Sequence, residues 1–483
     1  MQRKFVTNLG LVLVLNLLIK PFWVLGVDRA VQNAVGTEQY GFYYAIFNLS
    51  FLFNILLDFG ITNFNNKNIS QNNHLLSKHL SSILVLRVLL AILFSVITFI
   101  GGLMIGYTPD MMKLLVTVIV NQILISFILY LRSNLAGLHL FKTDSIISVL
   151  DRLIMIIICE ALLLTHKEQG SFDLRWFIYT QTFAYALVAF ITLIIVLKKA
   201  HVRRLYWRWP FFMMILKKSY PYAVLVLLMS FYNRIDSVML ERLLPFRIGA
   251  NEAGIYASAY RLLDAANMIA FLFAGLLLPI FARMIKLKQN VEEMVVLSFS
   301  LLVIPALVVA ICSYFFSYDL MNMLYTGDHI EESATVFKIL MCCFVPISTS
   351  YIFGTLLTAN GSMRQLNIMA STGMIINIGL NFYLIPKYSA AGAAISSIST
   401  QLFTSAAQVI MSKKLFDFKT NINLIGKVLF FILFCIGVSY FSHQLNLPWM
   451  VRFIIAAGTC MVAAFGLRII NLKNIYHIIK YGE

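Results

Sequence analysis

Long, continuously apolar segments dominate this sequence and restrict its fold more than any other feature. Several run for 18 residues or more, the length at which a helix crosses the hydrocarbon core of a bilayer. Hydrophobic residues make up 60% of the 483-residue chain and charged residues only 12%, with a mean hydropathy of +0.83. Soluble globular chains carry about 25% charged residues. The pattern predicts an all-α integral membrane protein, because the strands of a membrane barrel alternate between apolar and polar residues.

Polar residues divide the apolar segments into about fourteen predicted transmembrane helices. The expected ranges are about 5–27, 40–64, 79–106, 111–134, 143–165, 174–198, 214–242, 252–284, 293–317, 333–357, 364–385, 390–413, 421–442 and 449–470. The apolar run after the N-terminus lacks the small-residue cleavage site of a signal peptide, so we expect it to be retained as the first helix. An even number of helices places both termini on the same side of the membrane.

The charged residues predict which side that is. The net charge of +17 does not indicate nucleic-acid binding, because lysines and arginines lie in short loops between apolar segments. Alternate loops are basic, and the strongest, residues 198–218, carries seven cations and no acid. The remaining loops are acidic or balanced. The positive-inside rule therefore predicts that both termini are cytoplasmic, and the basic loop also suits contact with anionic membrane lipids.

An internal repeat appears when the sequence is shifted by 213 positions. Asp28-Arg29 then falls on Glu241-Arg242, Gly36 on Gly249, Gly41 on Gly254, Tyr43 on Tyr256 and Asn54 on Asn267. A repeat of this length in an apolar chain is typical of a two-halved transporter. It predicts four parts: an N-terminal bundle at 1–200, a basic cytoplasmic linker at 201–213, a second bundle at 214–415, and two further helices with a tail at 416–483.

Charged residues inside apolar helices are the candidates for function, because their burial in lipid is costly. Lys20, Arg152, Arg234 and Arg261 are predicted at similar depths, where they suit a large anionic head group. The carboxylates Asp58, Asp236 and Asp264 are candidates for ion coupling. A purely structural alternative stays open. Arg261 and Asp264 stand one turn apart and are able to neutralise each other, and Asp58 is able to pair with a basic loop.

Other residue types indicate no catalytic or metal chemistry. The six cysteines lie in apolar segments without zinc-site spacing, and the eight histidines are scattered. The sequence contains no phosphate-binding loop of the Gly-x-x-x-x-Gly-Lys-Ser/Thr type and no nucleophile elbow. Loops of at most about twenty residues leave no room for a separate catalytic domain. The sequence therefore predicts that the chain is not an enzyme and carries no cofactor.

Four short stretches resemble a known transporter family. Residues 16–21 (NLLIKP), 28–36 (DRAVQNAVG), 38–41 (EQYG) and 54–60 (NILLDFG) look like O-antigen (Wzx-type) polysaccharide flippases. These flippases belong to the multidrug/oligosaccharidyl-lipid/polysaccharide (MOP) exporter superfamily, which includes the multidrug MATE transporters. The resemblance is densest over residues 8–75, and the fourteen-helix layout extends it along the chain.

This resemblance implies two six-helix bundles around a central cavity, with two C-terminal helices outside. It also implies an undecaprenyl-pyrophosphate-linked oligosaccharide as substrate, which an alternating-access mechanism moves from the inner to the outer leaflet of the bacterial inner membrane. The buried cations suit its pyrophosphate independently. The resemblance further implies that a gradient of H+ or Na+ drives transport. Contact with polysaccharide polymerase machinery is a further expectation.

Three alternatives remain at this stage. A multidrug exporter of the same superfamily usually has twelve helices and favours cationic drugs, which the excess of buried cations disfavours. A lipid II-type peptidoglycan-precursor flippase shares the fourteen helices and the charged cavity. A membrane-bound glycan polymerase is expected to have a larger outer loop or a histidine-rich segment, and the sequence shows neither.

Overall fold

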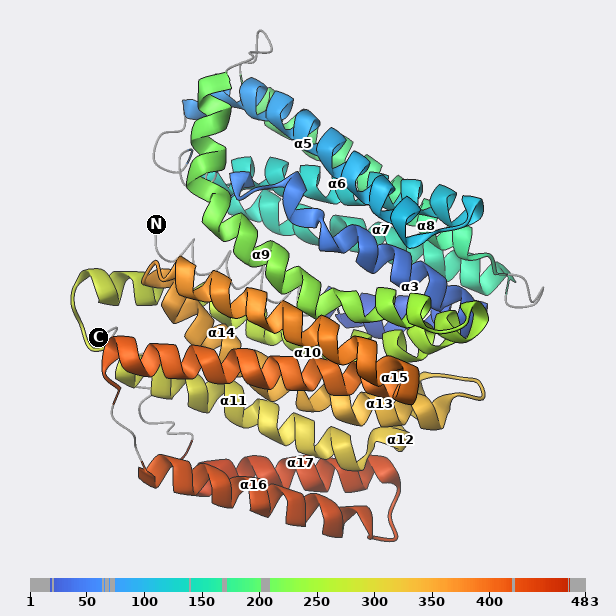
Figure 1. Cartoon of the computed structure of the whole chain (residues 1–483), viewed down its shortest axis with the longest axis vertical. Coiled ribbons are helices and arrows are strands. Elements are labelled where there is room, and N and C mark those ends of the chain that lie inside the picture. The colour runs from blue at the N-terminus through green and yellow to red at the C-terminus, as the bar shows by residue number, and fades with distance from the viewer. Residues whose placement is uncertain are drawn as a thin grey trace. The chain divides into compact units, whose positions relative to one another are not determined.

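The computed structural model contains two compact units, residues 1–257 and residues 258–483. It describes residues 18–62, 74–138, 140–166, 172–200, 209–418 and 422–467, except Lys20, and the single positions Asn65, Ile69 and Ile469. The described residues are helical and contain no strand, which confirms the all-α fold class (Figure 1). The boundary between the units falls inside one long helix and differs from the domain limits expected from the repeat, which remain a prediction.

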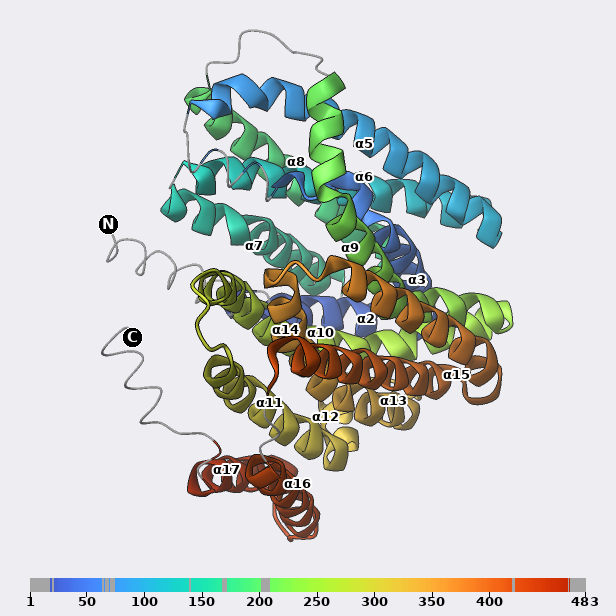
Figure 2. The ribbon, with the colours of Figure 1, turned by 60° about the vertical axis from the view of Figure 1, so that its left-hand side comes forward.

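The first unit consists of helices that pack on their neighbours in sequence and on helices farther along the chain. Its elements are η1 (Trp23–Asp28), α2 (Arg29–Val35), α3 (Thr37–Leu52), η2 (Asn54–Leu57), α5 (Leu75–Ile105), α6 (Pro109–Gly137), α7 (Phe141–His166), α8 (Leu174–Lys199), α9 (Trp209–Leu243) and the start of α10 (Phe246–Lys286). The most extensive of these longer-range contacts packs α6 on α8, and another places α9 along α3 although a long stretch of sequence separates them (Figures 1 and 2).

The second unit continues from α10. Its further elements are α11 (Glu292–Phe315), α12 (Ser317–Leu324), α13 (Ile330–Cys342), α14 (Phe344–Ala359), α15 (Met363–Phe416), α16 (Ile422–His443) and α17 (Trp449–Gly466). The last two helices pack on each other and, through α11, on the rest of this unit (Figure 2). The cysteines Cys312, Cys435 and Cys460 are fully buried where α11, α16 and α17 meet, as the sequence predicts for small core residues.

The helices agree closely with the predicted segments. Ten helices in the described part of the chain are long and apolar enough to cross a membrane. The longest, α15, is two predicted helices joined at Ser389, whose φ of 49° breaks the helical path. Conversely, α13 and α14 together occupy one predicted segment. Most of the first predicted helix, residues 1–17 and Lys20, lies outside the described residues. The chain is therefore a multi-pass membrane protein.

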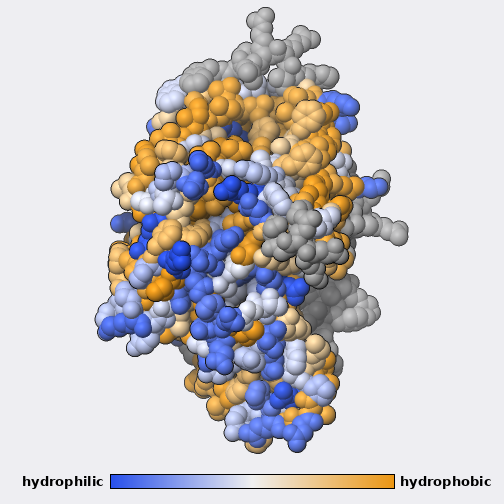
Figure 3. Space-filling view, turned by 90° about the vertical axis from the view of Figure 1, so that its right-hand side faces the viewer, coloured by the Kyte–Doolittle hydropathy of each residue, from blue (hydrophilic) through white to orange (hydrophobic). Residues whose placement is uncertain are grey.

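Large hydrophobic side chains on the outside of both units support this conclusion. Leu103, Phe190, Phe382 and Leu433 are among many that are more than half exposed. A soluble protein rarely leaves so much contiguous apolar surface in contact with water, but a helix in a bilayer faces apolar lipid tails. Figure 3 shows hydrophobic residues over much of the flanks of the molecule. The exposed apolar side chains and the lengths of the helices thus both indicate that the protein lies in a lipid bilayer.

The turn between α5 and α6 shows how local sequence ends and restarts a membrane helix. Gly106 closes α5 in a left-handed conformation with a φ of 81°, which a residue without Cβ adopts without strain. Thr108 then caps α6, its hydroxyl accepting a hydrogen bond from the Met111 amide. Pro109 follows at the first helical position, where the missing amide proton costs nothing. These four residues turn the chain back on itself within a few positions.

The repeat-equivalent glycines Gly41 and Gly254 lie against each other where α3 crosses α10. A Cβ atom at Gly41 would clash with the carbonyl oxygen of Ala250, and one at Gly254 would clash with that of Thr37. Thr37 and Ala250 are themselves 213 positions apart, so the contact is reciprocal. The two halves therefore cross with local pseudo-two-fold symmetry. The repeat shows that these positions are similar in sequence, but it does not predict that they touch. The Gln32 side-chain amide also donates to the Gly254 carbonyl at 3.0 Å.

The two turns before this crossing differ. Gly36 breaks the chain between α2 and α3 with a φ of 84°. Its repeat equivalent Gly249 lies inside the first turn of α10, where the absence of a side chain lets the carbonyl of Glu241 approach. The second half therefore turns a few residues earlier, at Leu244 and Pro245. The corners are similar in position but not in backbone geometry.

Candidate substrate and coupling sites

The predicted site residues are distributed over both units. Arg152, Arg234, Asp58 and Asp236 lie in the first unit, whereas Arg261 and Asp264 lie on the part of α10 that belongs to the second. Both of the latter side chains are partly buried. Lys20 lies outside the described residues. The expectation that four cations share one cavity thus remains a prediction, and the geometry is clearest within the first unit.

Arg152 on α7 is held by aromatic rings. Its guanidinium lies 5.4 Å from the centre of the Trp23 ring and 5.8 Å from that of Tyr185, and donates to the Tyr185 hydroxyl at 3.1 Å. It also forms a long ion pair with the Asp151 carboxylate, at 3.8 Å. The Arg152 side chain keeps 26% of its surface exposed. Rings support the cation through their negative faces without carrying a compensating charge, and the long ion pair leaves room for a closer anion.

Arg234 and Asp236 stand two residues apart on α9. The guanidinium of Arg234 lies 5.1 Å from the centre of the Phe51 ring on α3. Asp236 is completely buried and accepts a hydrogen bond from the Tyr256 hydroxyl at 2.7 Å. The next residue, Ser237, accepts a hydrogen bond from the Asn48 amide at 2.8 Å. The buried polar face of α9 is therefore bound to the two helices, α3 and α10, that meet at the glycine crossing.

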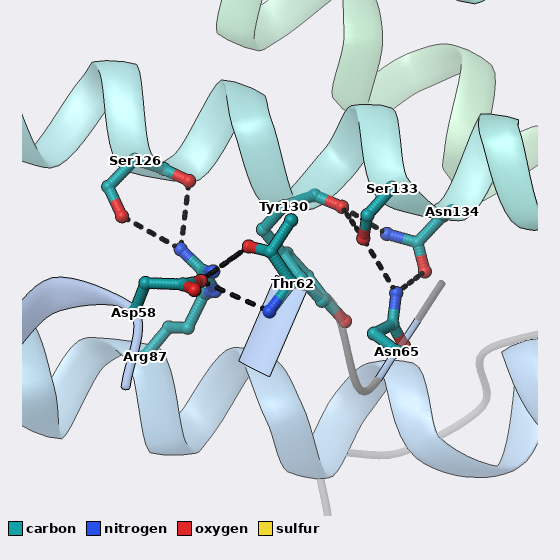
Figure 4. Close-up of polar contacts among 8 residues, drawn as sticks. All are labelled: Asp58, Thr62, Asn65, Arg87, Ser126, Tyr130, Ser133 and Asn134. Atoms are coloured by element: carbon teal, nitrogen blue, oxygen red, sulfur yellow. Dashed lines mark hydrogen bonds and ion pairs between the residues drawn. The ribbon is translucent and has the colours of Figure 1, made fainter. Parts of the chain in front are cut away.

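Asp58 lies where the second predicted helix breaks. The helix ends in the short η2, and the following residues Phe59 and Gly60 both have positive φ, 45° and 79°. The break places the Asp58 carboxylate against Arg87 of α5 in an ion pair, with additional hydrogen bonds from the amide and hydroxyl of Thr62 (Figure 4). The partner that the sequence suggested for Asp58 was a basic loop. In the structure it is an arginine inside a membrane helix.

This arrangement occupies both terminal nitrogens of Arg87. One of its terminal nitrogens donates to the carbonyl and hydroxyl of Ser126 on α6 at 2.8 and 2.9 Å, and the other donates to the Thr62 hydroxyl at 2.8 Å (Figure 4). Its guanidinium also lies 4.7 Å from the centre of the Tyr130 ring. Only 6% of the side chain is exposed. Arg87 and Asp58 therefore form a closed polar network that fastens α5 and α6 to the broken helix.

A pair of buried acids at repeat-equivalent positions is also part of the structure. Asp28 accepts a hydrogen bond from the Tyr40 hydroxyl at 2.8 Å, and Glu241 pairs with Arg242 at 2.6 Å. Arg242 also lies 4.6 Å from the centre of the Tyr107 ring at the α5–α6 turn. Burial, and secondarily the Glu241 carboxylate, raise the pKa of Tyr107. Asp28 and Glu241 thus make polar contacts at equivalent helix ends of the two halves.

The sequence identifies some of these residues but does not reveal their partners or roles. Arg87 lies inside the predicted helix at 79–106, but nothing in the sequence reveals its partner 29 residues away. The ring contacts of Trp23 and Tyr185 had no signal of their own, because aromatic residues are common in every membrane helix. The repeat did give the signal for Asp28 and Glu241, since it aligned the two acids directly.

Comparisons with known proteins define first a class and then a family. The lipid II flippase MurJ, in an inward-closed conformation, is similar over 95% of this chain and 98% of its own, with a TM-score of 0.71 and 14% identity. An inward-facing multidrug resistance MATE transporter of the MOP superfamily is similar over 85% of this chain and 98% of its own, with a TM-score of 0.59 and 13% identity. The fold is therefore that of the MOP superfamily, as the resemblance predicted.

A MOP superfamily transporter from Pyrococcus furiosus is similar over 85% of this chain and 95% of its own, with a TM-score of 0.59 and 13% identity. At sequence level, residues 12–285, more than half of the chain, match the family described as "Polysaccharide biosynthesis protein". The chain belongs to this polysaccharide biosynthesis family. No curated protein sequence matches it significantly.

Proposed function

We propose that the protein is a flippase that moves an undecaprenyl-pyrophosphate-linked oligosaccharide, such as an O-antigen repeat unit, from the inner to the outer leaflet of the bacterial inner membrane. It works by alternating access, and a gradient of H+ or Na+ drives it. The family match and the MOP fold support a transporter of lipid-linked polysaccharide precursors and not an enzyme. Beyond this, we propose an O-antigen class of substrate, a location in the inner membrane, and an orientation with both termini in the cytoplasm.

The environment of Arg152 is the observation that carries this proposal. A transport site for a pyrophosphate needs cations inside the membrane region whose charge is not already neutralised. Arg152 comes closest to this need, because rings support it, 26% of its side chain is exposed and its ion pair with Asp151 is long, at 3.8 Å. Arg87 does not meet it, because it is ion-paired with Asp58, its terminal nitrogens also bind Ser126 and Thr62, and only 6% of its side chain is exposed. In the proposal, Arg152 binds the head group together with Lys20, Arg234 and Arg261.

The carboxylates have separate roles in this scheme. Asp236 is the first candidate for ion coupling, because it is fully buried, two residues from Arg234, and hydrogen-bonded to Tyr256 of the next helix. Binding an ion or proton there changes the charge beside a substrate-binding cation. Asp264 takes the corresponding place next to Arg261 in the second unit. Asp58 contributes mainly structure through its ion pair with Arg87, although it was also a candidate for coupling.

Gene deletion followed by complementation tests the proposal. Without the protein, lipid-linked glycan is expected to accumulate on the inner leaflet while surface polysaccharide disappears, and expression of the wild-type chain is expected to restore both. An impermeant glycan-modifying enzyme added to spheroplasts reports which leaflet holds the glycan. Unchanged surface polysaccharide combined with new drug sensitivity would contradict the proposal and favour a multidrug exporter.

A second candidate function is the transport of lipid II, because MurJ is similar over 95% of the chain. Depletion distinguishes the two substrates. Loss of a peptidoglycan precursor flippase is expected to stop wall synthesis and cause lysis, whereas loss of a polysaccharide flippase leaves the wall intact. In either case, a polymerase that joins the exported units is the expected partner on the outer side.

A further inference from the structure

A cavity of about 700 Å³ lies in the first unit where α3, α6, α8 and α10 begin. Its lining combines aromatic and charged side chains, among them Phe42, Asp110, Phe172, Asp173, Trp176 and Phe246. The volume is in the range of small-molecule sites, about 300–1,000 Å³. Figure 3 faces this end of the helices and shows hydrophilic and hydrophobic residues interspersed on it. The predicted topology places this end on the outer side of the membrane.

We infer that this cavity is a carbohydrate-binding subsite that receives sugar rings of the transported glycan on the outer side. The inference deepens the proposed function and rests on it. A sugar ring has one face of C–H groups and a rim of hydroxyl groups. The first packs on aromatic rings and the second donates hydrogen bonds to carboxylates, so a binding site needs both kinds of side chain together.

The aromatic part of the cavity comes from two pairs of rings. Phe172 and Trp176 are 6.0 Å apart at an interplanar angle of 84°, and Phe42 and Phe246 are 5.0 Å apart at 42°. Because the rings of each pair are not parallel, the two pairs present both ring faces and ring edges around the cavity. Phe246 keeps 51% of its surface exposed. The rings therefore offer apolar area that the protein itself does not bury completely.

The charged part is acidic on balance. Asp110 lies in the first turn of α6, Asp173 is the N-cap residue of α8, and Arg175 follows on α8. Asp110 is 83% exposed and pairs with Lys113 at 3.2 Å, and Asp173 caps α8 by accepting from the Arg175 amide at 2.8 Å. The two carboxylates repel a pyrophosphate but accept hydrogen bonds from hydroxyl or amino groups. The cavity suits neutral or amino sugars and complements the cationic site of Arg152.

The arrangement differs from an aromatic belt at a membrane interface. Belt residues point outward into the head-group region. Here the rings belong to three helices and one preceding loop, and they enclose a concave space together with carboxylates. Phe42 follows Gly41 of the glycine crossing, and Phe246 opens the helix that contains Gly254. Any opening of that crossing therefore moves two walls of the sugar subsite, which couples its shape to transport.

Direct glycan binding tests this inference separately from transport. The probe is the oligosaccharide repeat unit released by mild acid from the cell's own lipid-linked glycan, titrated calorimetrically into purified protein in nanodiscs. Wild-type protein is expected to bind it saturably, and Trp176→Ala to weaken binding about tenfold or more, which corresponds to about 1.4 kcal/mol. Trp176→Phe, which keeps a ring, is expected to retain most of the affinity.

Two further variants complete the design. Phe183→Ala removes an exposed ring from the same helix, α8, outside the cavity, and is expected to bind as the wild type does. Asp110→Asn changes an exposed carboxylate without affecting folding, and is expected to weaken binding several-fold. Wild-type affinity in both Trp176→Ala and Asp110→Asn, or no binding to the wild type, would overturn the subsite. The proposed function itself fails only if deletion leaves glycan export intact.

Discussion

At the scale of single residues, two buried arginines illustrate how environment divides structure from function. Arg87 is enclosed by an ion pair with Asp58, hydrogen bonds to α6 and the Tyr130 ring. Arg152 is supported mainly by the rings of Trp23 and Tyr185 and remains partly exposed. A guanidinium that is already neutralised gains little from a phosphate, whereas one on aromatic faces gains a strong charge-assisted bond. Replacing Arg87 should therefore reduce stability, whereas replacing Arg152 should reduce transport.

Arg87→Ala is expected to destabilise the protein by about 3 kcal/mol, the lower end of the effect of breaking a buried pair, because Asp58 keeps 25% of its surface exposed. Thermal unfolding in detergent measures the loss. The double variant Arg87→Ala/Asp58→Asn removes the abandoned charge as well and is expected to recover part of it. A folded, equally stable Arg87→Ala protein without transport activity would instead assign Arg87 to the transport site.

Arg152→Ala is expected to slow translocation of lipid-linked oligosaccharide about tenfold or more, since a hydrogen bond to a charged group contributes about 1.5–3 kcal/mol. Proteoliposomes with labelled substrate measure the rate, and the melting temperature should change little. Arg283→Ala, an exposed cation at the end of α10, is the matched control and should transport normally. Equal rates in Arg152→Ala and Arg283→Ala would remove Arg152 from the substrate site.

At the scale of the elements, α3 and α10 cross with their backbones in close contact at two repeat-equivalent glycines. At Gly41 and at Gly254, a backbone carbonyl of the opposite helix occupies the space that a side chain would need. The polar face of α9 adds Asn48–Ser237 and Asp236–Tyr256 to the same region. Small residues at a helix crossing in lipid increase van der Waals contact where no hydrophobic effect drives association. The crossing should be sensitive to a single methyl group.

Gly254→Ala is expected to destabilise the first unit by about 1–3 kcal/mol, because the new Cβ clashes with the Thr37 carbonyl and backbone atoms cannot rotate away. The melting temperature in detergent reports the change. Gly275→Ala, on the same helix with nothing within 4 Å of the new Cβ, should instead be neutral or stabilising by about 0.5–1 kcal/mol. If both alanines behaved alike, the crossing would not depend on glycine.

At the scale of the whole molecule, charge along the sequence predicts an orientation that helix packing does not reveal. Basic residues occupy alternate loops, and the α5–α6 turn, with Asp110, belongs to the opposite, acidic set. The membrane-spanning helices have the same packing whichever way the chain is inserted. Only the loop charges, which interact with the insertion machinery and the inner leaflet, distinguish the two orientations.

Cysteine labelling tests the orientation. In spheroplasts, an impermeant maleimide should modify Thr108→Cys, at the exposed α5–α6 turn, but not Gln289→Cys, in the turn after α10. Five of the six natural cysteines are buried and the sixth is partly buried, so the background should be low. Inverted vesicles should give the opposite pattern. Labelling of Gln289→Cys alone in spheroplasts would reverse the predicted topology.

The sequence by itself determined the all-α membrane class, the approximate helices and the 213-residue repeat, because hydrophobic length and periodic similarity are properties of the chain alone. It also identified the buried charges, since burial of a charge follows from the segment that contains it. It did not determine their partners. That Asp58 meets Arg87, that rings hold Arg152, and that Gly41 touches Gly254 depend on which helices lie side by side. Such distant contacts arise only when the helices pack, so only the tertiary structure decided them.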